Sequence, residues 1–248
     1  MTDILLIVFV SISVFMASLF STVTGFGFAL VAVPFLMPLL GAHETVVFII
    51  FGTCLVKMIV LWNTRKHFEW HTVAVTVAGS VLGSLAGSYL LNAISPAYLQ
   101  ILLGTVLVIV LFMMGMHFDL SVKNKTVGRI TAGFLSGFSA ATTSISGPPV
   151  ALYFLTEGRD KLVTRANMCW IFAFGNIGTM FSLALSGSSI SGDLILLAAY
   201  VTLPMLLGTW IGERCFYKIN QHLFIRLTQI FIVIGACTAL YRGITALL

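Results

Sequence analysis

Residues 143–149 read TSISGPP and lie between two strongly apolar stretches of the chain. Two successive prolines remove two backbone donors, and the residue before a proline is pushed out of the helical region. We therefore predict that Ser146 and Gly147 are non-helical and that a new helix begins near Pro149, with proline in its first turn. Any fold of this chain must accommodate a helix that is interrupted here.

The rest of the chain is apolar almost throughout. Of its 248 residues, 59% are hydrophobic and only 8% are Asp, Glu, Lys or Arg, whereas soluble domains carry about 25% charged residues. The apolar blocks approach the roughly 17–25 residues that a helix needs to cross a bilayer, and they lack the alternation of β-barrel strands. The sequence predicts an all-α polytopic membrane protein. Its apolar blocks are 4–20, 45–62, 72–91, 97–114, 166–186, 194–212 and 223–241.

The polar connections between these blocks differ in charge. By the positive-inside rule, connections rich in Lys and Arg face the cytoplasm and connections without Lys or Arg face the other side. This assignment places both termini on the non-cytoplasmic side. The charged connections are 63–71, 116–129, 157–165 and 213–221, and the connections without Lys or Arg are 41–44, 92–97 and 186–193.

Two stretches must each begin and end on one side of the membrane under this topology. Residues 4–40 do so outside, and residues 129–157 do so in the cytoplasm. We predict that each is a broken helical hairpin, with the breaks at TGFG (24–27) and SGPP (146–149). Irregular backbone at membrane depth is tolerated only where protein or a watery cavity satisfies its polar groups.

The two halves of the chain resemble each other. Residues 15–36 align without gaps with residues 134–155, matching Phe15 to Phe134, and GSLAG (83–87) aligns with GTWIG (208–212). Self-similarity of this kind indicates a duplicated unit. Chance similarity between apolar helices is the alternative.

Each unit contains one broken hairpin followed by three single crossings, so the second unit is inserted upside down. We therefore predict two inverted-topology repeats, residues 1–121 and 122–248, within one integral membrane domain. Inverted repeats with discontinuous helices are typical of secondary transporters, which bind substrate near the midplane where the repeats meet.

The two breaks are the candidate binding site. Helix N-termini offer free N–H groups and a positive dipole end, so two of them that converge suit a small anion. The alternative is that TGFG only permits close packing and that SGPP is only a kink. The candidate residues are Thr24, Gly25, Phe26 and Gly27 at the first break and Ser144, Ser146, Gly147, Pro148 and Pro149 at the second.

Three further polar residues are candidate ligands. Lys57 corresponds to Asn176 under the repeat, and both lie inside otherwise apolar crossings, so both are candidates to face the anion. Alternatively, Lys57 snorkels to the cytoplasmic interface. Arg165 lies at the cytoplasmic end of its crossing, where it either draws an anion in or anchors the helix at the interface.

Other chemistry lacks support in the sequence. All eight acidic residues lie at or near segment ends, which disfavours a cation as substrate and leaves the coupling ion, H+ or Na+, open. The chain has no phosphate-binding GxxxxGKS/T loop and no zinc-protease helix, and its five histidines are dispersed. We expect no enzyme activity, no metal, no cofactor and no nucleic-acid partner. Small-residue patterns such as GSLAG leave a homodimer open.

The segments TGFGFALVAVPFL, SGPPVALYFLTEG and LVTRANM resemble the TauE/SafE family of sulfite and organosulfonate exporters. The resemblance implies a multi-pass protein of the bacterial inner membrane that moves small sulfur-containing anions. The chain departs from the family pattern in two places. Many members have a more glycine-rich first break, and a neutral residue is more usual at the position of Lys57, so the substrate stays open.

Taken together, these features predict a secondary transporter that exports a small sulfur-containing anion, such as sulfite or sulfoacetate, by alternating access. Its partners are the anion, membrane lipid and a coupling ion. An importer of a similar anion, a passive anion channel and a non-transporting membrane subunit are the alternatives.

Overall fold

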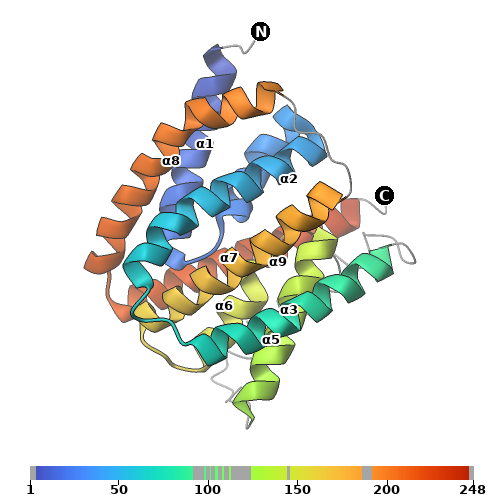
Figure 1. Cartoon of the computed structure of the whole chain (residues 1–248), viewed down its shortest axis with the longest axis vertical. Helices are drawn as coiled ribbons and strands as arrows, with labels where there is room; N and C mark the ends of the chain where they lie inside the picture. Colours follow the sequence, from blue (N-terminus) through green and yellow to red (C-terminus); the bar gives the residue numbers. More distant parts are fainter. Residues whose placement is uncertain are drawn as a thin grey trace.

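The computed structural model describes residues 4–91, 124–143, 146–185 and 192–245, together with positions 98, 101, 104, 105, 108 and 112. Every element described is an α-helix (Figure 1). The predicted crossing 97–114 lies largely outside the described residues, as does Ser144. The helices are α1 (Ile4–Thr24), α2 (Phe28–Thr64), α3 (Trp70–Leu91), α5 (Lys125–Thr143), α6 (Gly147–Thr156), α7 (Lys161–Leu185), α8 (Gly192–Lys218) and α9 (Gln221–Thr245).

Four of these helices are long and apolar enough to cross a membrane, counted over the described residues. They confirm the prediction of membrane-crossing helices, because each combines a hydrophobic stretch of at least the needed length with few charges. The four segments are Leu6–Thr24 in α1, Val47–Thr64 in α2, Leu196–Lys218 in α8 and Gln221–Thr245 in α9.

Both predicted helix breaks are present. At the first, Gly25 and Gly27 adopt positive φ values of 86° and 95°, which glycine reaches without the penalty of a Cβ, so α1 ends and α2 begins within a few residues. At the second, α5 ends at Thr143 and α6 begins at Gly147 with proline in its first turn.

The second break differs from the prediction in one respect. Ser146 lies outside the helices as the N-cap residue of α6, as predicted, although its own backbone has φ −91° and ψ −22°, whereas Gly147 is the first helical residue of α6 and is not non-helical as predicted. The first N–H groups of a helix have no partner within it, so the donors that Pro148 and Pro149 lack are not needed there. The helix therefore begins before the prolines.

The prediction that residues 41–44 form a connection between two helices is wrong. These residues are helical and belong to α2, which runs for 37 residues. They contain no proline, and one glycine inside a helix costs only about 1 kcal/mol. A straight helix of this length would be about 55 Å long, well beyond the roughly 30 Å of a bilayer core. Figure 1 shows that α2 instead bends sharply, so that its two arms run in different directions.

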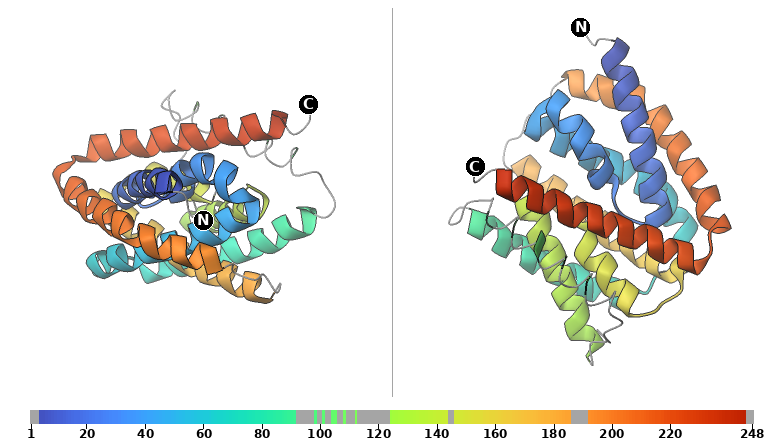
Figure 2. Two further views of the ribbon diagram at one scale, coloured as in Figure 1. Left: turned by 90° about the horizontal axis from the view of Figure 1, so that it is seen from above. Right: turned by 180° about the vertical axis from the view of Figure 1, so that it is seen from behind.

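Two helix pairs pack backbone against backbone, and each pair joins the two halves of the chain. Helix α3 packs on α5, and α1 packs on α8 (Figure 2). A Cβ placed on Gly83 would lie 2.0 Å from the carbonyl oxygen of Phe134, and one placed on Gly208 would lie 2.4 Å from that of Phe15. The sequence alignment matches these residues, Gly83 with Gly208 and Phe134 with Phe15. The two interfaces therefore use equivalent positions.

The connections predicted to be cytoplasmic meet at one end of the molecule. Arg159 forms an ion pair with Glu69, and the Gln221 side-chain amide donates to the carbonyl of Arg159 at 2.9 Å. Arg129 of α5 pairs with Glu157 at 3.3 Å. Contacts between all four charged connections place them on the same side, as the positive-inside assignment requires.

Candidate functional site

The two helix breaks touch each other. Phe26, at the centre of the first break, is buried to 2% exposure. A Cβ added to Gly147 at the start of α6 would lie 2.3 Å from Cδ2 of the Phe26 ring, so only glycine permits this contact. Helix α9 closes the other side, with the Phe231 ring centroid 6.4 Å from that of Phe26. The fold thus brings together residues of both predicted halves of the site.

The starts of α2 and α6 carry no side-chain caps. Gly27 and Ser146 are the N-cap residues, and neither makes a side-chain hydrogen bond to its helix. The first N–H groups of a helix are unpaired within the helix and lie at its positive end. The Thr24 hydroxyl does not cap either helix start. It contacts the carbonyls of Phe20 and Phe26 at 2.9 and 2.7 Å.

Lys57 lies inside the protein beside the first break. Its side chain is 1% exposed, and its Nζ donates to the carbonyl oxygen of Gly25 at 2.6 Å and to the Cys169 thiol at 3.7 Å. The snorkelling alternative is therefore wrong. Gly25 follows the last residue of α1, where a cation suits the negative end of the helix dipole. Both acceptors are neutral, so the charge of Lys57 is not cancelled by them.

Arg165 lies at the same break and is completely buried. A Cβ on Gly25 would be 3.4 Å from both Cα and Cγ of Arg165. Its guanidinium forms an ion pair with Glu213 of α8 and stacks over the ring of Phe216 at 4.0 Å. The anchoring alternative, which needs an interfacial side chain, is wrong for Arg165.

Several buried polar atoms around this break have no hydrogen-bond partner among the described residues. Buried polar groups are normally paired, so a group of unpaired ones in one place calls for an explanation such as a ligand. They point to polar species as the natural occupants of the region. These atoms are the hydroxyls of Ser21 and Thr22, Nε and Nη1 of Arg165 and Oε2 of Glu213.

The family is shown by a match over nearly the whole chain. The family described as "Sulfite exporter TauE/SafE" matches residues 10–242. The chain belongs to the TauE/SafE family. The match confirms the resemblance seen in the sequence and makes the protein a member of a family of membrane transporters. No curated protein and no solved structure gave a match.

Asn176 lies apart from both breaks of this TauE/SafE protein. It is two helical turns from Cys169 on α7, and its side chain lies beside Cys54 of α2. Cys54 is in turn one turn from Lys57, so Asn176 and Lys57 occupy the same α2–α7 contact. Within the described part of the chain, the amide nitrogen of Asn176 is buried without a partner.

Glu213 is the site residue that the sequence analysis missed. It lies near the end of its crossing, where a carboxylate is ordinary, and 48 residues separate it from Arg165. Only the folded structure, in which the Arg165 side chain of α7 reaches α8, reveals the pair.

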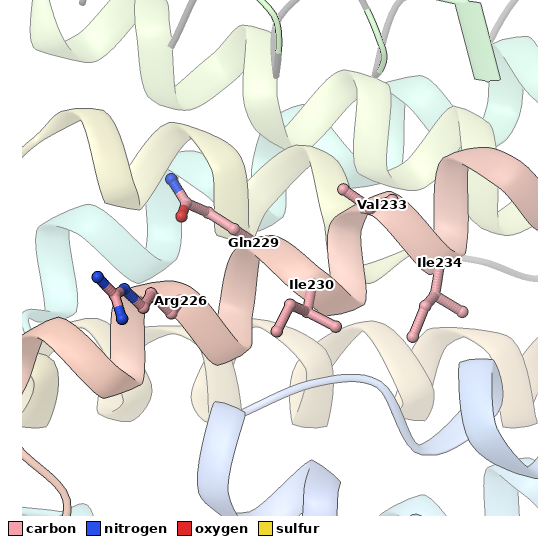
Figure 3. A pocket seen from close by; sticks show the side chains of 5 residues that line it. All are labelled: Arg226, Gln229, Ile230, Val233 and Ile234. Carbon is pink, nitrogen blue, oxygen red and sulfur yellow. The ribbon is translucent and has the colours of Figure 1, made fainter. Parts of the chain in front are cut away.

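A hollow of about 320 Å3 lies elsewhere, along the outer face of α9 (Figure 3). Its lining contains no residue of either break, and Ile230 in it is 52% exposed. An exposed apolar helix face is what lipid requires of a membrane protein. The lining residues are Arg226, Gln229, Ile230, Val233 and Ile234.

Proposed function

We propose that this TauE/SafE protein is a secondary transporter that exports a small sulfur-containing anion, such as sulfite, sulfoacetate or another organosulfonate. The anion is held where the two helix breaks meet, with Lys57 and Arg165 beside it. The observation that carries the proposal is the placement of two buried cations against Gly25 of the first break, which itself touches the uncapped start of α6 through Phe26. Such a place is electrostatically suited to a negative charge.

The depth of the second break supports a site inside the membrane. Helix α6 has 10 residues, so it is about 15 Å long at about 1.5 Å per residue. It ends at Thr156, beside the charged connection that begins at residue 157. The break therefore lies about half of a roughly 30 Å bilayer core away from that end.

Burial of the site favours alternating access over an open channel. Phe26, Lys57 and Arg165 are exposed by 2%, 1% and 0%, so in this conformation an anion reaches them only after helices separate. A continuous water-filled pore would leave its anion-binding residues exposed to water. A gated site closed to water is what a carrier passes through between its two open states.

The glycine contacts support the inverted-repeat arrangement. Gly83 meets Phe134 across α3 and α5, and Gly208 meets Phe15 across α8 and α1. A pseudo-two-fold axis relating the two halves would generate one contact from the other. In addition, α2 packs on α8 and α7 packs on α3, which such an axis also relates. The charged connections then face the cytoplasm of a bacterial cell, with both termini outside.

Binding is tested on purified protein by ligand-dependent thermal stabilisation, because a ligand that binds only the folded state raises its melting temperature. The ligands are sulfite, sulfoacetate, taurine and a plain dicarboxylate. Wild type is compared with Lys57→Met and with Lys66→Met, a matched control on an exposed lysine. Stabilisation by sulfite or sulfoacetate that Lys57→Met loses and Lys66→Met keeps supports the site.

Stabilisation by none of these anions in folded protein contradicts the substrate class. Transport is tested separately in vesicles loaded with the anion that binds. A carrier shows saturable flux and counterflow, whereas flux without saturation or counterflow contradicts alternating access.

A further inference from the structure

The buried cluster beside the first break has an uneven charge count. It contains the cations Lys57 and Arg165 and the single carboxylate of Glu213, which contacts Arg165. With Glu213 ionised, the cluster carries one net positive charge. Burying an uncompensated charge is costly, so the cluster is balanced when a monoanion joins it.

We propose that Glu213 is a proton-binding residue of the anion site, so that binding of a dianion is coupled to the uptake of one proton. The inference rests on the proposed function, since it needs an anion at this break. A dianion added to the cluster with Glu213 ionised leaves one net negative charge. Transfer of a proton from water to a Glu213 carboxylate oxygen restores neutrality, with one O–H bond formed and no change in oxidation state.

The geometry allows Arg165 to contact both Glu213 and an anion at the break. Its side chain begins against Gly25 and reaches Glu213, so it links the break to α8. A guanidinium has five N–H donors. Nε and Nη1 of Arg165 have no partner in the described part of the chain, and one Glu213 oxygen is likewise unpaired. An anion at the break therefore shares Arg165 with Glu213 and competes with it.

Cations face this pair from two helices. On α7, Lys161 lies over the Phe216 ring at 5.1 Å, but its side chain is only partly buried and donates to the carbonyls of Phe216 and Ile219, so it is not one of the buried charges counted above. On α2, Lys57 contacts the carbonyl of Gly25, the same residue against which Arg165 packs.

The other groups around the pair are uncharged or directed elsewhere. On α1, the unpaired hydroxyl-bearing Thr22 packs beside Gly212. On α9, Phe224 packs against Phe216. Arg214, next to Glu213, stacks on Trp210. A dianion bound at the break would therefore be the main change in charge near Glu213.

The experiment measures protons taken up when an anion is added to purified protein in weakly buffered solution with a pH indicator. The probes are sulfoacetate, which carries two negative charges at neutral pH, and ethanesulfonate, which carries one. We expect about one proton per bound sulfoacetate and none per bound ethanesulfonate. The affinity for sulfoacetate should fall about tenfold for each pH unit of increase, as linkage to one proton requires.

Three variants assign the proton. Glu213→Gln is expected to bind sulfoacetate without proton uptake and with an affinity independent of pH. Glu213→Asp keeps a carboxyl group and should retain the uptake even if the amide variant does not fold. Glu69→Gln, which removes a carboxylate from the loop before α3, is the matched control and should also retain it.

Two outcomes overturn the proposal. Binding of sulfoacetate by wild type without proton uptake, or uptake that persists in Glu213→Gln, overturns this inference and leaves the proposed function standing. Absence of binding by both anions overturns the proposed function, and this inference falls with it.

Discussion

The ammonium nitrogen of Lys57 lies 2.6 Å from the carbonyl oxygen of Gly25. A cation near the C-terminal end of α2 therefore contacts the backbone of the break that precedes the same helix. Because that carbonyl and the Cys169 thiol are neutral, the contact orients the charge without cancelling it. Lys57 is thus placed for a negatively charged partner at the first break.

Replacement of Lys57 by Met separates its binding role from its structural role. Met has a similar volume and removes the uncompensated charge, which offsets the lost hydrogen bond of about 1 kcal/mol. We expect the stability without ligand to stay within about 1 kcal/mol of wild type. The affinity for the anion should fall at least about tenfold, or about 1.4 kcal/mol. Strong destabilisation with unchanged affinity would make Lys57 a helix cap only.

The contact between the two breaks predicts coupling between Phe26 and Gly147. Gly147→Ala puts a methyl group into the Phe26 ring and should destabilise the protein by about 1–3 kcal/mol. In a background with Phe26→Ala the same change should cost much less, because the ring is gone. Thermal unfolding of the two single variants and the double variant gives the coupling energy. Additive effects would mean that the two breaks do not pack on each other.

The breaks themselves could be predicted because their cause is local. Gly25 and Gly27 adopt positive φ values, and Pro148 and Pro149 lack backbone N–H donors. Each feature favours the end of one helix and the start of another at that place in the sequence. Both predicted breaks are confirmed. Helix α6 begins at Gly147 and not near Pro149 as predicted, because the first turn of a helix tolerates prolines that a helix interior does not.

Features that depend on packing could not be predicted in this way. The sequence places Lys57 a few residues from a charged connection, which fits snorkelling as well as burial, and only the position of α7 decides between them. The Arg165–Glu213 pair likewise joins two helices with no motif in common. The continuity of α2 through residues 41–44 could not be predicted, because a short polar tetrapeptide such as GAHE occurs in a loop as readily as in a helix.

The two glycine interfaces predict matched effects of added methyl groups. Gly83→Ala and Gly208→Ala each force a Cβ against a backbone carbonyl that cannot move aside like a flexible side chain. We expect each to destabilise the protein by about 1–3 kcal/mol, and under the proposed inverted repeat the two effects should be similar in size.

Gly175→Ala is the control for these variants, since a Cβ there meets nothing within 4 Å. It should be neutral or stabilise α7 by up to about 1 kcal/mol. All three are compared by thermal unfolding in one detergent. A large effect at Gly83 alone, with Gly208 tolerant, would contradict the equivalence of the two halves.

The ion pair between Glu69 and Arg159 predicts a contribution to stability that is lost in acid. The Arg159 guanidinium hydrogen-bonds to the Glu69 carboxylate and holds the pKa of that carboxyl below its usual value near 4.5. Because the folded state favours the ionised form, the contribution is fully present above about pH 4.5 and is lost as the pH falls through the lower pKa of the folded state.

Glu69→Gln should therefore lower the melting temperature at neutral pH and make no difference once wild-type Glu69 is itself protonated. The Glu69 side chain is 46% exposed, so solvent screening keeps the difference small, within about 1 kcal/mol. Melting temperatures of the two proteins across this pH range provide the measurement. A gap that widens on acidification would contradict the pair, because a protonated Glu69 has no charge to offer Arg159.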